Sequence, residues 1–416
     1  MFNVVESFSG IGSQVKALKR LGIEYEIKAT IDWDINAIIA YDFIHHGEQD
    51  LSELDKLTDY ELLKELSKFT LSRDGKSPIT EKGLKNLKRE KMLRLLSAIN
   101  RCNNLGSITD VTSEMLDFDI DLFTYSFPCQ DLSIASAWHG NNSGIDRNAN
   151  NRSGMLWEVE RILIERYKSN KQMPRFLLME NVSNILSATH KENFKEWKNI
   201  LVDMGYYNKI YALNARDFGI PQRRTRVYML SVYIGKDNTK KVNLEEYFVN
   251  NDLGQGFVQE KLNINHKSIA EFLRIDYSNE IYYKEALEAQ PNDTASRQRI
   301  YNENELIVKK DRINVDDIAT ITTKQDRHPN SGVIDFSSGV EGKSNFRYLT
   351  PRECFLLMGF DEEDFQILID NNFYCGKKIK LFNNSTLYKL AGNSIVVDVL
   401  EAIFSQMIEI NKKILN

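Results

Sequence analysis

Residues 2–34 read FNVVESFSGIGSQVKALKRLGIEYEIKATIDWD. The opening FNVVESF has the apolar character of a short buried strand. The segment after it predicts a helix, because Val15, Leu18 and Leu21 recur every three residues and share one face. YEIKATIDWD, which begins at Tyr25, predicts a second strand. Strand, helix and strand in this order predict an α/β fold built on a parallel, doubly wound sheet.

The same alternation continues along the chain and is interrupted twice. We expect a helix over 35–44 and further strands over 119–127, 174–182 and 226–234. The first interruption is a charged, helix-favouring insertion, and the second is a long polar stretch without alternation. We interpret the insertion as a solvated helical segment. The alternative is a contact with a DNA backbone through its basic residues, Lys85, Lys88, Arg89, Lys91 and Arg94.

These interruptions predict the domain organisation. We expect residues 1–234 to form the main domain, with the insertion at about 47–106. Residues 235–345 form a smaller, irregular domain, and residues 346–416 return to the main domain and end in a helix. That helix places its apolar side chains on one face: Val397, Leu400, Phe404 and Met407.

The composition is typical of a soluble globular protein, with 42% hydrophobic and 27% charged residues. A net charge of −5 excludes a protein that is basic all over, although a basic cleft for nucleic acid can lie within an acidic whole. The N-terminal segment does not resemble a signal peptide, and no apolar run approaches the ~18 residues of a membrane helix. We therefore expect a cytoplasmic protein without membrane contact.

The four cysteines, Cys102, Cys129, Cys354 and Cys375, are widely separated. They form no CxxC pair and have no histidine at ligand spacing. This pattern predicts neither a metal site nor a disulfide framework, and it fits a reducing compartment.

The loop FSGIG, residues 8–12, lies between the first strand and the first helix. Its two glycines allow the backbone to approach a ligand closely, although a tight turn alone would explain them. Asp32 follows Gly12 by 20 residues and ends the second strand, where a carboxylate can bind ribose hydroxyls. Trp33 beside it could cover an adenine. The pattern predicts a nucleoside-containing cofactor, and the missing third glycine and GK[ST] ending argue against NAD and ATP.

Cys129 lies in FPCQ, just after a predicted strand, where open α/β sheets place their ligand crevice. A reactive cysteine needs access to substrate and a lowered pKa, whereas a structural cysteine packs as a small apolar residue. The residues next to Cys129 leave both interpretations open.

Charged residues mark two further candidate sites. Glu180 follows the apolar run FLLM and is either a functional acid or part of a structural ion pair. Arg224 and Arg226 lie two apart, on one face of an extended segment, and can bind a carboxylate, a carbonyl or a phosphate. Arg223 fits a solvated turn. GNSI predicts the start of the C-terminal helix, where capping alone would explain Ser394.

Taken in order, FSGIG, the strand-end acid, FPCQ, ENV, QRRTR, TPRECFLLMGF and GNSI resemble the motifs of the DNA (cytosine-5) methyltransferase family, in its bacterial or phage restriction–modification form. The resemblance covers about residues 1–234 and 346–416. It implies a Rossmann-like, S-adenosylmethionine-dependent methyltransferase fold. It also implies methyl transfer to carbon 5 of a cytosine that is flipped out of double-stranded DNA.

The resemblance assigns roles to the candidate residues. Cys129 attacks carbon 6 of the cytosine, and Glu180 engages ring nitrogen 3 and the exocyclic amine. Arg226, and with it Arg224, would hold the ring carbonyl and order the cysteine loop. Pro128 would fix that loop and contact the base.

The resemblance also implies a pocket for S-adenosylmethionine. Its residues would be Phe8, Ser9, Gly10, Gly12, Asp32, Trp33, Ser107, Pro128, Leu156, Asn393 and Ser394. Ser107 stands where the family often has an aspartate that binds the adenine amino group. Ser107, a shifted Asp110 or the backbone would make that contact here.

Within residues 235–345, DIATITTKQDRHPNSG resembles the family's target-recognition core. It assigns DNA contacts to Thr320, Ile321, Lys324, Gln325 and Arg327. Arg327 could pair with guanine and Gln325 with adenine in the major groove. The alternative is that these are solvated loop residues.

Two other functions use the same motifs. One is a tRNA cytosine-5 methyltransferase, and the other is a non-catalytic DNA-binding regulator with this fold. A large variable region favours DNA recognition, and Cys129, Glu180 and Arg226 together argue against a pure binder. We expect a monomer whose functional partner, without stable contact, is a cognate restriction endonuclease.

Overall fold

The computed structural model describes residues 1–128, 152–256, 262 and 264–415. The expected nucleophile, Cys129, lies outside these residues. The chain divides into two compact units. Unit 1 consists of Met1–Leu213, Thr225–Leu262 and Leu400–Asn416, and unit 2 consists of Asn214–Arg224 and Asn263–Val399.

The units divide the chain at other places than the sequence predicts. Residues 346–399, which we expected in the main domain, cluster with residues 263–345. Residues 235–262 instead cluster with the N-terminal part of the chain. The reason is local packing, because the helices after residue 350 pack on one another, and the strand Phe346–Arg347 before them packs on the helix Glu280–Ala289.

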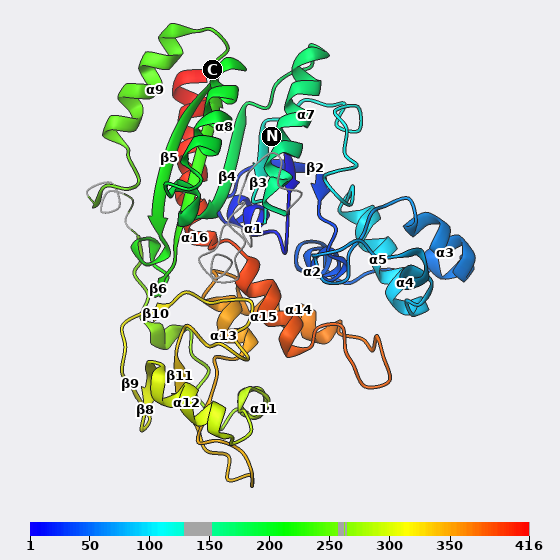
Figure 1. Ribbon diagram of the computed structural model, residues 1–416, viewed down its shortest axis with the longest axis vertical. Coiled ribbons are helices and arrows are strands. Elements are labelled where there is room, and N and C mark those ends of the chain that lie inside the picture. Colours follow the sequence, from blue (N-terminus) through cyan, green and yellow to red (C-terminus); the bar gives the residue numbers. More distant parts are fainter. Residues whose placement is uncertain (129–151, 257–261, 263, 416) are drawn as a thin grey trace. The chain divides into compact units, whose positions relative to one another are not determined.

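Among its described residues, unit 1 holds a six-stranded sheet in the order β2–β1–β3–β4–β7–β5 (Figure 1). The strands are β1 (Phe2–Ser7), β2 (Tyr25–Ile31), β3 (Leu122–Tyr125), β4 (Phe176–Val182), β5 (Tyr206–Asn214) and β7 (Thr225–Tyr233). The strands β1 to β4 run parallel, whereas β7 is antiparallel to β4. The α/β fold class is confirmed, with one antiparallel strand. The sequence analysis missed β5, whose residues are mostly half-exposed and lack a continuous apolar run.

Helices cover both faces of this sheet. The helices in the described residues of unit 1 are α1 (Ser13–Arg20), α2 (Ile35–His46), α3 (Asp59–Leu66), α4 (Glu81–Lys85), α5 (Arg89–Arg101), α7 (Leu156–Lys168), α8 (Lys191–Asp203), α9 (Asn238–Asn250) and the greater part of α16 (Val397–Ile410). The predicted apolar face of α16 is buried. No helix in the described residues is both long and apolar enough to cross a membrane.

Side chains that alternate along the strands pack on opposite faces. Val5 of β1, Phe123 of β3 and Leu177 of β4 belong to the main core, which α7 and α8 complete. Trp197 of α8 is fully buried there, and its indole nitrogen donates to the Tyr125 hydroxyl at 3.2 Å. The strands are apolar on both faces because both faces are covered.

Glu6 is a charged exception on β1, fully buried beneath α1 and α2. Its carboxylate accepts hydrogen bonds from the Tyr41 hydroxyl at 2.5 Å and from the Val15 N–H at 3.2 Å. Burial is the larger effect and raises the pKa of Glu6 from 4.5 to about 7, although both hydrogen bonds lower it. Glu6 thereby joins the first strand to the two helices that follow.

Unit 2 is not irregular as expected. Its described residues include the four-stranded sheet β12–β11–β8–β9 and the parallel pair β10–β6. The strands are β6 (Gln222–Arg223), β8 (Leu306–Lys309), β9 (Arg312–Ile313), β10 (Ile318–Ala319), β11 (Val333–Asp335) and β12 (Phe346–Arg347). The helices are α11 (Glu280–Ala289), α12 (Ala295–Glu303), α13 (Pro351–Leu356), α14 (Glu362–Asp370) and α15 (Asn384–Asn393). These elements are short, so their periodicity is too brief to be recognised in sequence.

Short helical turns complete both units. They are η1 (Leu54–Lys56), η2 (Arg152–Met155), η3 (Ser183–Leu186), η4 (Ala215–Phe218), η5 (Ile269–Glu271) and η6 (Asn411–Leu415).

Unit 2 is organised around the TPRE segment. Arg347 and Glu353 form a fully buried ion pair in which two guanidinium nitrogens donate at 2.8 and 2.9 Å. The Glu353 carboxylate also accepts from the Thr350 N–H at 2.7 Å, which closes the capping box of α13. The Arg347 guanidinium holds the pKa of Glu353 below its usual value despite burial.

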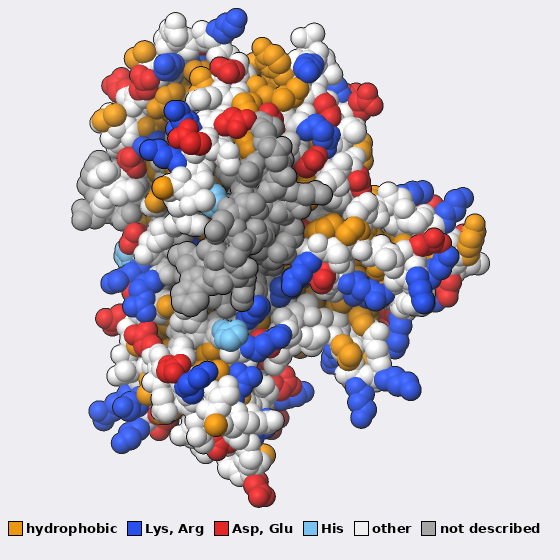
Figure 2. Space-filling view, in the orientation of Figure 1, with side chains coloured by type: hydrophobic (Ala, Val, Ile, Leu, Met, Phe, Trp, Pro, Cys, Tyr) orange, Lys and Arg blue, Asp and Glu red, His pale blue; other side chains and the backbone are white. Residues whose placement is uncertain are grey.

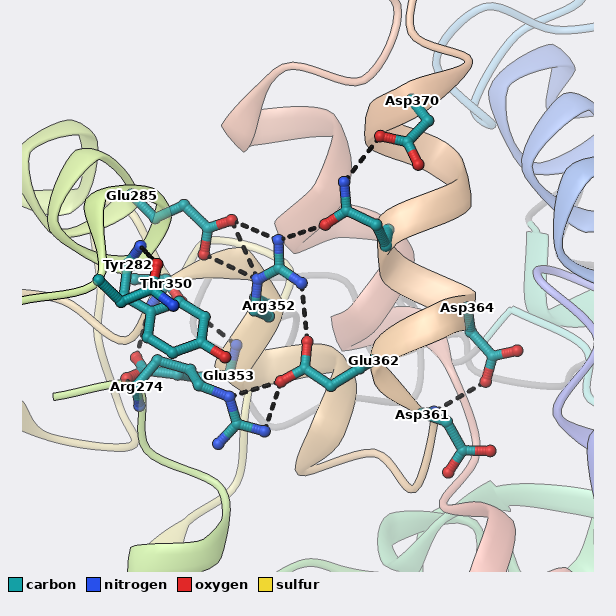
Figure 3. Close-up of polar contacts among 12 residues, drawn as sticks. Arg274, Tyr282, Glu285, Thr350, Arg352, Glu353, Asp361, Glu362, Asp364 and Asp370 are labelled. Carbon is teal, nitrogen blue, oxygen red and sulfur yellow. Dashed lines mark hydrogen bonds and ion pairs between the residues drawn. The ribbon is translucent and has the colours of Figure 1, made fainter. Parts of the chain in front are cut away.

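Arg352, which is itself part of the TPRE segment, links three helices. Figure 3 shows the Arg352 guanidinium between Glu285 and Glu362, which come from α11 and α14. Arg352 donates to Glu285 at 2.8 to 3.0 Å and to Glu362 at 2.7 Å (Figure 3). Arg274 donates to the other oxygen of Glu362 at 2.5 Å. These contacts pack α13 against α11 and α14.

Glu6 generates a prediction about the pH dependence of stability. Its pKa is about 7 when folded and about 4.5 when unfolded, so between these pH values only the folded state holds the proton. The free energy of unfolding therefore falls as pH rises through this window, by about 3 kcal/mol from Glu6. Glu6→Gln should remove this contribution. Urea unfolding at pH 5 and pH 8 should show a smaller loss of stability at pH 8 for Glu6→Gln than for the wild type.

Glu24→Gln, at an exposed position, is the matched control and should behave like the wild type. An equal pH dependence in the wild type and Glu6→Gln would contradict the assignment.

Candidate active site

The carboxyl ends of three neighbouring strands lie side by side in the sheet of unit 1. Ser7 of β1 pairs with Tyr125 of β3, which pairs in turn with Met179 of β4. The glycine loop begins one residue later at Phe8, FPCQ begins two residues later at Phe127, and Glu180 directly follows Met179. Because the three strands are parallel, all three segments leave the sheet at the same edge.

Hydrogen bonds tie these segments together. The Ser126 hydroxyl donates to the Phe8 carbonyl at 3.3 Å, and the buried Asn181 amide donates to the Phe127 carbonyl at 3.1 Å. These bonds hold the backbone that leads into Cys129 between β1 and β4. Cys129 itself lies outside the described residues, so its role stays a prediction.

Glu180 of β4 faces Arg226 of the antiparallel β7. Glu180 Oε1 and Arg226 Nε are 3.4 Å apart, and the side chains are only 12% and 17% exposed. The strand register produces this contact, because Val182 pairs with Arg226. The structure fits both interpretations of Glu180, a structural ion pair and a functional acid. Glu180 is paired with Arg226, and the pair lies at the carboxyl ends of the parallel strands, where ligands bind in such sheets. Such a carboxylate can accept hydrogen bonds from a ring N–H and an amine, and the guanidinium can donate hydrogen bonds to a carbonyl.

Arg224 does not act beside Arg226, and this expectation is corrected. Its buried guanidinium donates to the carbonyls of Ile321, Gly392 and Ser394 at 3.0, 3.1 and 2.9 Å, all within unit 2. The expectation assumed one continuous extended segment. The chain instead turns at Arg224, between β6 and β7.

The residue before Arg224 is also paired. The Arg223 guanidinium contacts Glu305 at 2.9 Å and Asp317 at 3.3 Å, on an exposed surface of unit 2. It is exposed, as expected, but it lies in the short strand β6 instead of a turn, and its acidic partners come from the same unit.

The loop after β1 has the backbone that a close ligand contact requires. Phe8, Gly10 and Gly12 have positive φ angles of 57°, 55° and 77°, a region that glycine adopts readily. A Cβ at Gly10 would meet no atom within 4 Å, so space is open beside it. A Cβ at Gly12 would clash with His45 and Tyr41 of α2. Gly10 thus leaves space for a ligand beside the backbone, whereas Gly12 allows α2 to pack closely against the loop.

Asp32 lies beside this loop at the end of β2. One carboxylate oxygen accepts from the Gly10 N–H at 2.9 Å, and the other accepts from the Asp34 N–H at 2.9 Å. Ser9 is buried within the loop, and Trp33 is half-buried next to Asp32. Open space beside Gly10 and a neighbouring carboxylate fit a nucleoside-containing ligand. The contact of Asp32 with a ribose stays a prediction.

Ser107 and Asp110 belong to one short turn. The Ser107 hydroxyl is 2.8 Å from the Thr109 hydroxyl, and the Asp110 N–H donates to the Ser107 carbonyl at 3.1 Å. Ser107 is buried and Asp110 is exposed. Both groups that could replace the usual adenine-binding aspartate are therefore close together.

Two expected pocket residues have side chains with structural roles. Leu156 at the start of α7 has no exposed surface and packs in the main core. Ser394 ends a helix instead of beginning one, because α15 ends at Asn393 and α16 begins at Val397. The Ser394 hydroxyl donates to the Leu390 carbonyl at 2.8 Å. The prediction that GNSI starts the C-terminal helix is wrong.

The residues predicted to read bases lie in unit 2 and differ in exposure. Ile321 and Gln325 are buried, and the Gln325 amide donates to the Ser331 hydroxyl. The pairing of Gln325 with adenine is therefore corrected, because its side chain does not reach the surface. Lys324 and Arg327 are exposed.

Thr320 contacts the neighbouring strand. Its hydroxyl donates to the Arg223 carbonyl at 2.7 Å, and the Ile321 N–H donates to the Gln222 side chain at 3.0 Å. These contacts join residues 318–321 to the QRR segment.

A cavity of about 1090 Å³ lies beside Arg327. Arg297 of α12 and His328 also line it, and Arg297 donates to the Tyr348 hydroxyl at 2.8 Å. The sequence analysis missed Arg297 because it lies in a stretch that we interpreted as irregular. The available signal was Thr294, which caps α12 by accepting from the Arg297 N–H.

One side-chain cluster offers metal-ligand chemistry. Atoms of Asp42, His46 and Cys102 lie within 4.8 Å of one another. The Asp42 carboxylate already contacts Arg101 at 3.2 Å and accepts from the Gln49 amide at 2.7 Å. The protein itself thus satisfies Asp42, and the expectation of no metal stays a prediction.

The chain is similar in sequence to known methyltransferases. The family model described as C-5 cytosine-specific DNA methylase matches residues 69–409. The orphan methyltransferase M.SssI of Spiroplasma monobiae is 32% identical over 97% of this chain and 96% of that protein. The type II methyltransferase M2.ScrFI of Lactococcus lactis subsp. cremoris is 32% identical over 98% of this chain and 99% of that protein.

The fold is similar to that of solved methyltransferases. The crystal structure of the S. pombe Dnmt2 methyltransferase matches with a TM-score of 0.57 and 18% identity, over 98% of this chain and 99% of that chain. The family match across most of the chain and the two relatives at 32% identity lead to one conclusion: the chain belongs to the C-5 cytosine-specific DNA methylase family.

Proposed function

We propose that this DNA cytosine-5 methylase works through a covalent adduct between Cys129 and carbon 6 of a cytosine in double-stranded DNA. The observation that supports it is the pairing of Glu180 with Arg226 at the edge where β3 leads into the FPCQ segment. A carboxylate and a guanidinium at that position match the charge that develops on a cytosine ring under attack.

The proposed chemistry divides one difficult substitution into easier steps. The Cys129 thiolate forms a bond to carbon 6, and the ring electrons shift toward nitrogen 3, where Glu180 supports protonation. Carbon 5 is then nucleophilic and takes the methyl group. Loss of the carbon 5 proton to a base or water restores the double bond and releases the thiolate. Arg226 would hold the ring carbonyl, and Pro128 would fix the loop.

S-adenosylmethionine supplies the electrophilic methyl group in this proposal. We place its nucleoside beside the open backbone of Gly10, with Asp32 toward the ribose and Trp33 toward the adenine. Ser107 or Asp110 would bind the adenine amino group.

The choice of DNA sequence belongs to unit 2 in this proposal. Lys324 and Arg327 are exposed in the segment that resembles a target-recognition core, and Arg297 adds a guanidinium beside the same cavity. Base flipping would bring the cytosine to Cys129. The methylated sequence would be protected from a cognate restriction endonuclease.

Methyl transfer from labelled S-adenosylmethionine tests this function on duplex DNA and on tRNA. We expect incorporation into duplex DNA, at cytosine carbon 5. Incorporation into tRNA alone would favour a tRNA methyltransferase, and no incorporation would favour a regulator.

The covalent step makes Cys129 indispensable. Cys129→Ser should abolish methyl transfer while cofactor binding persists, because an unactivated serine hydroxyl is a much weaker nucleophile. Cys375→Ser, at a half-buried position in unit 2, is the matched control and should keep substantial activity. Turnover of Cys129→Ser near the wild-type rate would contradict the covalent mechanism.

The carboxylate beside the glycine loop should control cofactor affinity. Asp32→Ala removes one charge-assisted hydrogen bond to the ribose, so affinity should fall roughly tenfold to a hundredfold. Calorimetry with S-adenosylmethionine, without DNA, measures this directly. Asp50→Ala, at an exposed position, should bind like the wild type. Unchanged affinity of Asp32→Ala would rule out this placement of the pocket.

Arg327 should contribute to sequence choice. Arg327→Ala should relax specificity at one base pair, with a loss of about 1–3 kcal/mol of discrimination. Lys324→Ala should instead weaken binding to all sequences alike, as expected of a phosphate contact. Sequencing of methylated cytosines in a randomised DNA library distinguishes these outcomes. An unchanged sequence preference in Arg327→Ala would contradict its role as a base reader.

A further inference from the structure

The insertion between α2 and β3 lies outside the motif series. Its helices α3, α4 and α5 form a lobe of unit 1 (Figure 1), on which basic and acidic side chains are mixed (Figure 2). Three of the basic residues that could contact a DNA backbone, Lys85, Arg89 and Arg94, contact acidic side chains within the lobe. Arg89 contacts Asp59 at 2.6 Å and Asp55 at 3.1 Å, and Lys85 contacts Glu81. This pairing does not favour a role in binding phosphate.

A short segment of the insertion, residues 69–73, returns to the sheet edge, and we name it the strap. The Ser72 N–H donates to the Trp33 carbonyl at 2.6 Å, and the Ile35 N–H donates to the Ser72 carbonyl at 3.0 Å. Asp34 and Ser72 form an isolated parallel bridge. The strap therefore holds the turn after β2 by its backbone, directly beside Asp32.

The strap also touches the turn that carries Ser107. Gly106 has a φ angle of +74°, and a Cβ there would lie 3.3 Å from Phe69 Cβ and 3.3 Å from the Thr70 carbonyl oxygen. Gly106 in turn donates its N–H to the Asn104 side chain at 2.9 Å. One face of the strap thus packs on the turn after β2, and another packs on Gly106.

The strap is held in shape by its own hydrogen bonds. The fully buried Ser72 hydroxyl donates to the Ser77 carbonyl at 2.6 Å and accepts from the Gly75 N–H at 3.0 Å. The Ile79 N–H donates to the Leu71 carbonyl at 2.7 Å. These bonds connect the strap to residues 75–79 and hold its backbone between the two turns.

We propose that the strap is a positioning element for the adenosine part of S-adenosylmethionine. It keeps the turn with Asp32 and Trp33 and the turn with Ser107 at a fixed separation before the cofactor binds. Pre-organisation of this kind raises affinity, because less ordering occurs on binding. The inference rests on the proposed function, since it assumes that these two turns hold the cofactor.

Two variants test the strap from opposite sides. Ser72→Ala removes the hydroxyl that closes the strap, and Gly106→Ala pushes Phe69 and Thr70 away from the Ser107 turn. Each should raise the Kd for S-adenosylhomocysteine roughly 3- to 30-fold in calorimetry without DNA. The kcat at saturating S-adenosylmethionine and the affinity for duplex DNA should stay at the wild-type level.

Hydrogen exchange gives an independent readout. In the wild type, the Ser72 and Ile35 amides should exchange more slowly when S-adenosylhomocysteine is bound, because binding stabilises the strap contacts. In Ser72→Ala this added protection should be smaller.

Arg89→Ala is the matched control, because it loosens the outer helices of the same insertion without touching the strap. It should lower the melting temperature and leave the Kd for S-adenosylhomocysteine unchanged. The inference is overturned if both strap variants bind like the wild type, or if Arg89→Ala weakens binding as much as they do. It is also overturned if the strap variants lose DNA affinity instead. A wild-type protein that neither binds the cofactor nor methylates DNA would contradict the proposed function, and the strap inference with it, whereas the outcomes above contradict the strap alone.

Discussion

The register of the parallel strands is the constraint on which the candidate site depends. Ser7, Tyr125 and Met179 form one row across β1, β3 and β4, so the segments after them leave the sheet side by side. Backbone hydrogen bonds between strands fix this row, and a slip of one residue would turn Glu180 to the opposite face. The antiparallel β7 then brings Arg226 to Glu180. Four segments that are far apart in sequence become one sheet edge in this way.

Both units contain buried charges, and the two cases differ in their energetics. Arg347 and Glu353 neutralise each other, and the surrounding donors complete the shell of the carboxylate. Glu6 has a hydroxyl and an N–H as partners, so its ionised form carries an unbalanced desolvation cost. Glu6 nevertheless joins β1 to α1 and α2, and it fixes the helix that follows the glycine loop. Ionised Glu6 therefore lowers the stability of the fold, while its hydrogen bonds connect β1 to the two helices next to the glycine loop.

Neighbours in the sequence can have separate roles in the fold. Arg224 and Arg226 are two residues apart, yet one closes contacts inside unit 2 and the other faces Glu180 in unit 1. Gln325 and Arg327 are equally close, and one is buried while the other is exposed. Residues two apart lie on one face only where the backbone is extended, and in each case a turn interrupts the extended backbone. The rule of alternate faces holds only along an unbroken strand.

The sequence by itself determined the strands of the main sheet other than β5, and the order of the motifs, because long apolar runs and glycine turns leave a local signature. It therefore predicted β1 to β4, β7, the loop at Gly10 and Gly12, and the acids Asp32 and Glu180. Only the tertiary structure decided the reversed direction of β7, the place of Arg224, and the burial of Gln325. It alone brought the strap to Trp33 and His46 to Cys102. These features depend on contacts between residues distant in sequence, and no local pattern records which distant segments will meet.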